Sequence, residues 1–179
     1  MTIIDEVVTK VPDWNGKNVS ITALSGGLTN SNFKVEVDGT PYFVRVPGAS
    51  TELLAIDRNN EHHNTKAASE AGVAPRVLHH LLEYNVMVLE FLNGKTMSKD
   101  SLNELGQPTR MAQAIKRLHA GKRFLLDFNM FRLTEYYLRL CKDRAIKTPD
   151  GFRERMLAVS AIEEAMNVKP LATVPCNND

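Results

Sequence analysis

The chain has 179 residues, of which 43% are apolar and 24% charged, and its formal net charge is +1. This composition is typical of a folded globular protein and excludes an intrinsically disordered one. The 22 basic and 21 acidic residues nearly cancel, so the overall charge gives no basis for binding nucleic acid or an anionic membrane surface.

Targeting and membrane signals are also missing from the sequence. No segment has the ~20 consecutive apolar residues that a membrane span requires. The N-terminal residues MTIIDEVVTK carry acidic side chains early and lack the apolar core and cleavage site of a secretory signal. Cys141 and Cys176 are too far apart to form a metal spacing or a disulfide framework. We therefore expect a cytoplasmic protein with no membrane span.

Residues 19–48 predict an antiparallel sheet. Phe33, Val35 and Val37 alternate with polar residues, which is the period of a half-buried strand. The dipeptide at 38–39, Asp-Gly, is a strong signal for a tight hairpin turn. The next strand covers 42–46 and ends at a Pro-Gly pair. A glycine-containing turn therefore lies between the first two strands.

A helix is predicted over residues 52–71, because Gly72 stands where a C-terminal glycine cap belongs. The stretch 74–94 then predicts two more short strands, broken near residues 83–85 and ended by Asn-Gly at 93–94. The predicted order of this part is β-β-β-α-β-β.

After Gly94 the pattern becomes helical. We expect helices near 108–121, 131–146 and 150–167, the first opened by Pro108. The fold class is thus α+β, with a sheet-containing lobe over 1–93 and a partial all-helical lobe over 94–179. Apolar faces of these helices would be exposed in the chain alone, so we expect self-association through them.

The turn LSGGLTNSNF is the first candidate for chemistry. Two adjacent glycines let the backbone approach a bound group closely, and the hydroxyls and amides around them can bind phosphate oxygens. Kinase-type folds cover nucleotide phosphates with such a hairpin. An ordinary polar turn is the alternative. The candidate residues are Ser25, Gly26, Gly27, Thr29, Asn30 and Asn32.

Arg45 and Glu61 form the second candidate. Kinases hold the nucleotide phosphates with a cation on a strand and orient it with a carboxylate on the following helix. The usual cation is lysine, but arginine offers a two-pronged donor for the same anion. The alternative is a surface ion pair of little energetic value. Arg58 could compete for Glu61, because the two are three residues apart on a helix.

The third candidate is the end of the last predicted strand, where Glu90, Phe91 and Leu92 would form the connector whose backbone binds adenine. The fourth is the terminal PCNND, in which Asp179 stands where a kinase has the catalytic base. The adjacent histidine pairs at 62–63 and 79–80 are poor chelators, because neighbours on a helix point about 100° apart. We assign no residue as a metal ligand.

Taken in order, these pieces resemble the choline/ethanolamine kinase family within the aminoglycoside-phosphotransferase-like superfamily. The resemblance extends from Leu24 to Asp179. It rests on LSGGLTNSNFKV, YFVRVPG, IDRNNE, GVAPRVL, VMVLEFLNG, IKRLHAG, FNMF with EYY, and PCNND. The forms GGLTN, VRVPG and IDR look more like the choline kinases than the antibiotic kinases.

The resemblance implies a protein-kinase-like two-lobed fold that binds ATP and Mg²⁺ and phosphorylates a small alcohol, with choline or ethanolamine as the substrate. In this family Ser25 to Asn32 would cover the phosphates, Arg45 would hold them, Glu61 would orient Arg45, Glu90 to Leu92 would bind adenine, and Asp179 would be the base.

Two features depart from the family pattern. Asn177 replaces the usual histidine, and the family's metal ligands would follow Asp179. We therefore expect little or no turnover from these residues alone. The alternatives are a non-catalytic nucleotide-binding pseudokinase, or a kinase acting on thiamine, an aminoglycoside or a sugar.

Overall fold

The computed structural model describes residues 2–27, 29–48, 51–167 and 172–176. Their contacts divide the chain into two compact units. One unit runs up to Leu125 and also contains the segment that starts at Val174; the other covers Leu126–Thr173. The lobe boundary between residues 93 and 94 stays a prediction.

The first unit is built on a five-stranded antiparallel sheet in the order β1-β2-β3-β5-β4. The strands are β1 (Val19–Leu24), β2 (Asn30–Val37), β3 (Thr40–Pro47), β4 (Val77–Leu81) and β5 (Val86–Glu90). The hairpin expected at Asp38 and Gly39 is confirmed. Both residues have positive φ angles, 47° and 80°, as the preferred two-residue hairpin turn requires.

The helix that follows β3 starts later than the sequence predicted. A short 3-10 turn, η2 (Thr51–Leu54), comes first, and α2 spans Arg58–Glu70. Two residues cause the interruption: Ala55 has a φ of 53°, and the carboxylate of Asp57 accepts from the backbone N–H of Asn60 at 2.9 Å. An aspartate in this position caps a new helix.

The predicted glycine cap at the other end of α2 is confirmed. Gly72, with a φ of 72°, donates its N–H to the carbonyl of Ser69 at 2.9 Å, and Val73 donates to Ala68 at 3.0 Å. This pair of bonds is the Schellman motif, which favours glycine because of its left-handed backbone.

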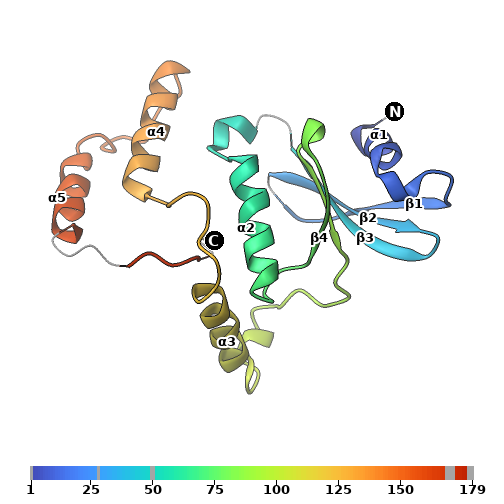
Figure 1. Ribbon diagram of the computed structural model, residues 1–179. Helices are drawn as coiled ribbons and strands as arrows, with labels where there is room; N and C mark the ends of the chain where they lie inside the picture. Colours follow the sequence, from blue (N-terminus) through green and yellow to red (C-terminus); the bar gives the residue numbers. More distant parts are fainter. Residues whose placement is uncertain (1, 28, 49–50, 168–171, 177–179) are drawn as a thin grey trace. The chain divides into compact units, whose positions relative to one another are not determined.

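A helix that the sequence reading missed covers one face of the sheet. It is α1 (Ile3–Lys10), followed by η1 (Pro12–Trp14). Figure 1 shows α1 and α2 on opposite sides of the sheet. Side chains of α1 and η1 pack on alternate residues of the strands and form the hydrophobic core. Its buried members are Ile4, Val7, Val11, Trp14, Val35, Val37, Val44, Val46, Val86 and Val88.

Polar contacts at the rim of the core hold α1 on the sheet. Tyr84, in η3 (Leu82–Tyr84), donates its hydroxyl to the carboxylate of Glu6 at 2.8 Å. This hydrogen bond raises the pKa of Tyr84 to about 12. The ring of Tyr42 lies 5.0 Å from that of Trp14, centroid to centroid.

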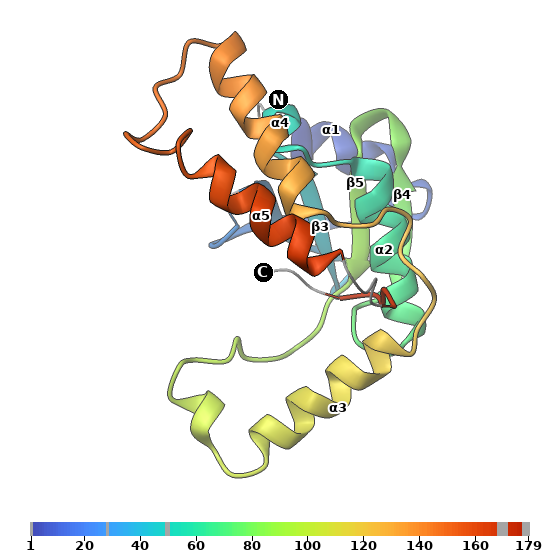
Figure 2. The same ribbon diagram turned by 90° about the vertical axis from the view of Figure 1, so that its left-hand side faces the viewer.

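The opposite face of the sheet carries the polar and charged side chains of the candidate site. Arg45 of β3 is paired with Met87 of β5, and its neighbour Phe43 is paired with Leu89. Directly paired residues point to the same face of an antiparallel sheet. Helix α2 lies beside β4 on this side (Figure 2), and its residue Ala67 is buried.

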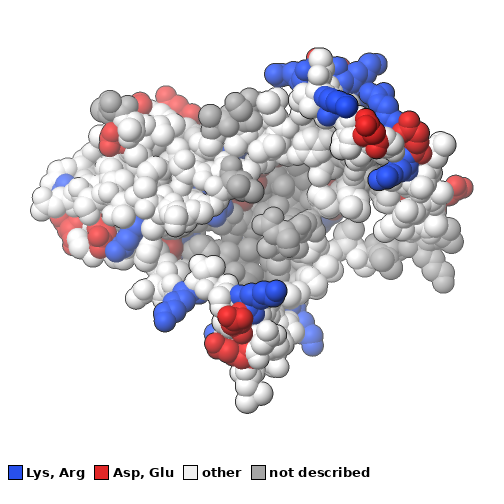
Figure 3. Space-filling model, turned by 180° about the vertical axis from the view of Figure 1, so that it is seen from behind, with Lys and Arg blue, Asp and Glu red and all other residues white. Residues whose placement is uncertain are grey.

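The first unit also contains η4 (Ser101–Asn103) and α3 (Gln107–His119). Proline at position 108 lies in the first turn of α3, as expected. Figure 3 shows basic and acidic side chains next to one another at several places on the visible surface. Among the described residues, no helix is long and apolar enough to cross a membrane.

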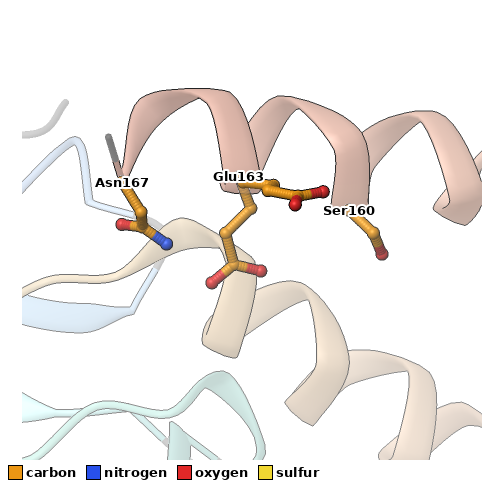
Figure 4. Close-up of a pocket in the computed structure, with 4 residues that line it drawn as sticks. Ser160, Glu163 and Asn167 are labelled. Atoms are coloured by element: carbon orange, nitrogen blue, oxygen red, sulfur yellow. The ribbon is translucent and has the colours of Figure 1, made fainter. Parts of the chain in front are cut away.

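The second unit contains α4 (Met130–Asp143) and α5 (Met156–Met166). Asn129 caps α4 by accepting from two backbone N–H groups. Arg132 of α4 donates to both carboxylate oxygens of Glu163 on α5, at 2.6 and 2.5 Å. Figure 4 shows Glu163 on one side of α5 with Ser160 and Asn167, where the three line a shallow hollow. Because Glu163 is bound by Arg132 of the neighbouring helix, we interpret the hollow as part of the α4–α5 packing.

The role of α1 in the core gives a direct stability test. Val7 is completely buried, whereas Ile3 on the same helix is 48% exposed. Val7→Ala should lower the free energy of unfolding by about 2–3 kcal/mol, because it removes buried methyl groups and leaves a cavity. Ile3→Ala is the matched control, with an expected loss below about 1 kcal/mol. Urea unfolding followed by the fluorescence of Trp14, the single tryptophan, measures both. Equal small losses would mean that α1 is not packed on the sheet in solution.

Candidate functional site

The glycine turn between β1 and β2 has the backbone that its sequence suggested. Gly26 and Gly27 have φ angles of 102° and 99°, a region that residues with a side chain rarely adopt. A Cβ on Gly27 would also lie 3.0 Å from the carbonyl oxygen of Asn30. Asn32 donates its amide N–H to the carbonyl of Gly26 at 3.2 Å. The turn is therefore fixed by backbone geometry and by one side chain of β2.

The end of the turn is attached to β3. Gly48 donates its N–H to the carbonyl oxygen of Thr29 at 2.9 Å. A Cβ on Gly48 would lie 2.9 Å from that same oxygen, closer than real Cβ atoms approach, so only glycine fits here. The hydroxyl of Thr29 accepts from the side chain of Asn30 at 3.3 Å. Ser25, before the glycines, is exposed.

Arg45 and Glu61 come together as the sequence suggested. The Nη1 atom of Arg45 lies 3.1 Å from Oε1 of Glu61 on α2. Their side chains are 31% and 20% exposed, so the pair is partly shielded from water and is not a freely solvated surface bridge. Arg45 is also the cross-strand partner of Asn32. Its guanidinium therefore lies on the same face of the sheet as the residue that holds the glycine turn.

Arg58 is a second cation on the same carboxylate. Its Nη1 atom lies 2.6 Å from Oε2 of Glu61, which confirms the expected contact between residues three apart on the helix. The same nitrogen donates to Oδ1 of Asn30 at 2.8 Å, and Nη2 donates to the hydroxyl of Thr51 at 2.7 Å. Two guanidinium groups and one carboxylate leave one positive charge in excess, which favours an anion at this place.

Two buried polar atoms on this face have no hydrogen-bond partner among the described residues. They are Oδ1 of Asn32 and Nε of Arg45. A buried polar group without a partner costs about 1–3 kcal/mol. Such a cost is common where a ligand completes the hydrogen bonds. An acceptor and a charged donor beside a glycine turn are suited to a ligand that carries both hydroxyl groups and phosphate oxygens.

The predicted connector lies at the end of β5. Glu90 is the last residue of the strand, and its carboxylate lies 3.0 Å from Nε of Arg76. Its side chain is thus directed to this surface partner, whose hydrogen bond lowers the pKa of Glu90. Phe91 lies beyond the strand, with the Nζ atom of Lys34 5.4 Å from its ring centroid. Leu92 is 61% exposed.

Arg45 also faces a cavity of about 520 Å³ inside the first unit. Its other walls come from α2, the α2–β4 connection, β5, α3 and the segment before the end of the chain. They are Asn64, Thr65, Ala68, Val73, Ala74, Pro75, Leu89, Ala114, Ile115, Leu118, Phe124 and Cys176. Cys176 thus lines the same cavity as Arg45, and Pro175 before it is buried.

The predicted base, Asp179, and Asn177 lie outside the described residues. Among the residues that are described, no group of three or more His, Cys, Asp or Glu side chains is arranged to hold a metal ion. The described residues therefore do not form a complete Mg²⁺ site, and we assign no step to the metal.

The sequence reading missed Thr51 and underestimated Arg58. Thr51 is buried and donates its hydroxyl to the carbonyl of Gly48 at 3.2 Å, while accepting from Arg58. The only sequence signal was the spacing of Arg58 and Glu61. Nothing local in the sequence points to Thr51, because its partners come from other segments.

The family model described as "Phosphotransferase enzyme family" matches residues 20–177 of the chain. Among curated proteins, the chain is 27% identical over 157 residues to Protein LicA of Haemophilus influenzae, covering 86% of this chain and 46% of LicA. It is 29% identical over 107 residues to the choline kinase of Saccharomyces cerevisiae, covering 59% of this chain and 18% of that enzyme.

The fold of the chain is also similar to that of a solved structure. The choline/ethanolamine kinase family protein from Mesorhizobium loti matches with a TM-score of 0.73 and 28% identity, over 98% of this chain and 57% of that one. The expected α+β, protein-kinase-like fold is thereby confirmed. In each of these matches the chain covers well under two thirds of the relative's length.

Two histidine rings, one on α2 and one on β4, stack against each other. The rings of His62 and His80 are 3.9 Å apart, centroid to centroid, and tilted by 24°. Burial lowers the pKa of both imidazoles below the ordinary value of 6.5. Lys66 and His63 lower the pKa of His62 further, and His62 lowers that of His80, while Glu61 raises the latter.

These shifts predict a loss of stability on acidification. Below the ordinary pKa the unfolded chain binds protons that the folded stack resists, so stability falls as the pH drops through 6.5 toward the lower folded-state pKa. His80→Phe keeps an aromatic ring and removes one titrating group. The melting temperature should therefore fall less between about pH 8 and about pH 5.5 in this variant than in the unchanged chain. His119→Phe, on the exposed end of α3, is the control, and the same pH slope in all three proteins would contradict the prediction.

Proposed function

Because the chain belongs to the phosphotransferase enzyme family, we propose that it forms the nucleotide-binding part of an ATP-dependent kinase for a small alcohol, most specifically choline or ethanolamine. The family match and the relatives confirm the resemblance inferred from the sequence motifs. The chain spans about half the length of LicA and of the Mesorhizobium loti protein and less of the yeast choline kinase, so the activity and substrate of the whole protein are part of the proposal.

One observation carries the proposal. Arg45 pairs with Glu61 at 3.1 Å on the sheet face next to the glycine turn, and its buried Nε atom has no partner in the described part of the chain. A strand cation held by a helix carboxylate is how kinases place nucleotide phosphates. An Nε–H without a partner among the described residues and the excess positive charge support the proposal that this face binds phosphate.

The remaining roles follow from position. The turn from Ser25 to Asn32 would cover the phosphates, with backbone N–H groups and the side chains of Thr29 and Asn30 near the ligand. The backbone of Glu90, Phe91 and Leu92 would bind the adenine edge, which fits the direction of the Glu90 carboxylate toward Arg76. Phosphoryl transfer depends chiefly on positioning and charge stabilisation, and these residues would supply the positioning of ATP.

Asp179 would accept the proton of the alcohol as the alcohol oxygen attacks the γ-phosphorus, the bond from that phosphorus to the bridging oxygen breaks and ADP leaves. This proposal rests on the order of motifs, with Cys176 lining the cavity that Arg45 faces. Mg²⁺ would neutralise the phosphate charge when bound. The described residues do not supply a complete set of ligands for it.

The acceptor is proposed from the printed names of two relatives, a choline kinase and a choline/ethanolamine kinase family protein. Side-by-side phosphorylation assays of the whole protein with choline, ethanolamine, thiamine, an aminoglycoside and a sugar test it. Transfer to choline or ethanolamine is the expected outcome. Nucleotide binding without transfer to any acceptor would favour the pseudokinase alternative.

Self-association and location are further proposals. The helices carry exposed apolar side chains, among them Ile115 of α3 and Leu157 and Ile162 of α5. Such side chains favour contact between copies of the chain. A cytoplasmic location stays a prediction.

The nucleotide proposal is tested by Arg45→Ala. We expect the affinity for ATP to fall about 10- to 100-fold, because charge-assisted hydrogen bonds contribute about 1.5–3 kcal/mol. The affinity for adenosine, which has no phosphate, should change less than about twofold. Isothermal titration calorimetry measures both ligands.

Arg110→Ala is the charge-matched control. Arg110 is exposed on α3 and donates to Gln107 of the same helix. It should leave ATP binding unchanged. Unchanged ATP affinity in Arg45→Ala would mean that Arg45 is only a structural charge.

A further inference from the structure

Arg58 stands where a cation is electrostatically disfavoured. It is the first residue of α2, directly after the capping Asp57, and the N-terminus of a helix carries a partial positive charge. Its side chain is nevertheless only 14% exposed. A partly buried guanidinium at this position has to be stabilised by acceptors, and the identity of those acceptors indicates what it does.

The three acceptors come from three separate segments. They are Oδ1 of Asn30 at the start of β2, the hydroxyl of Thr51 in η2, and Oε2 of Glu61 in α2, at 2.8, 2.7 and 2.6 Å. Thr51 in turn donates to the carbonyl of Gly48, and Gly48 donates to Thr29. Arg58 therefore links the end of the glycine turn, the end of β3 and the helix that carries Glu61.

The contacts of Glu61 are unequal. Oε2 of Glu61 lies 2.6 Å from the guanidinium of Arg58, whereas Oε1 lies 3.1 Å from the guanidinium of Arg45. Arg58 thus makes the shorter contact and compensates the carboxylate charge. Because of this compensation, Glu61 orients Arg45 without cancelling the positive charge that a phosphate would meet.

We propose that Arg58 is a positioning residue for nucleotide phosphates. It fixes Glu61 and Asn30, keeps Arg45 oriented toward the ligand, and joins the glycine turn to α2. It acts through Glu61 and Arg45 and does not itself contact the nucleotide. This role rests on the proposed function, since it requires that Arg45 binds phosphate.

A double-mutant cycle tests this dependence. ATP and adenosine affinities are measured by calorimetry for the unchanged chain, Arg58→Gln, Arg45→Ala and the double variant. Arg58→Gln should lower ATP affinity about tenfold when Arg45 is present and less than about twofold when Arg45 is absent. Adenosine affinity should stay within about twofold throughout. A merely structural residue would affect both ligands alike.

Arg58→Lys provides a second variant with the charge retained. One ammonium group cannot reach three acceptors from separate segments as a planar guanidinium does. We expect an intermediate ATP affinity, about threefold below that of the unchanged chain, again only when Arg45 is present. If Arg58→Gln does not fold, as judged by the fluorescence of Trp14, the cycle with Arg58→Lys decides the question.

The outcomes separate this role from the proposed function. Equal losses of ATP affinity with and without Arg45, equal losses for ATP and adenosine, or no loss at all would overturn the positioning role of Arg58. An Arg45→Ala variant that binds ATP normally would overturn the proposed function, and the role of Arg58 with it.

Discussion

The site depends on one carboxylate that two guanidinium groups share. Glu61 contacts Arg45 of β3 and Arg58 of its own helix, so the position of α2 on the sheet determines where the Arg45 charge lies. These three side chains together carry one positive charge in excess. The buried Nε–H of Arg45 has no partner among the residues that the structure describes, and an anionic ligand would supply the missing acceptor. In the proposed kinase, the excess positive charge and this hydrogen-bond donor would together bind the phosphates.

One face of the sheet forms the hydrophobic core and the other carries the site. The core therefore stabilises the fold without the residues of the site. Valines and Trp14 form a dry core under α1 on one face, while the other face is left for Asn32, Arg45 and the cavity. The succession of strands and helix and the C-terminal cap of α2 could be predicted, because alternation, Asp-Gly and a C-terminal glycine are local signals. Helix α1 was missed although Ile4, Val7 and Val11 have helical spacing, because its value comes from burial against distant strands.

The site was only partly readable from the sequence for the same reason. The glycine turn and the pairing of Arg45 with Glu61 follow from motif order, which reflects a fold-wide arrangement. The joint binding of Arg58 by Asn30 and Thr51 depends on three segments meeting in space. No periodic pattern in the sequence predicts contacts between such distant segments. The role of Asp179 rests on its place in the motif order.

The measurement that tests the central claim most directly is a nuclear magnetic resonance titration of the arginine Nε–H signals. The signal of Arg45 is assigned with the Arg45→Lys variant, which lacks it. If the unpartnered Nε–H of Arg45 is the phosphate donor, its resonance should move strongly on addition of ATP and remain in place on addition of adenosine. An unchanged Arg45 signal at saturating ATP would contradict the account, because the nucleotide phosphates would then be bound elsewhere.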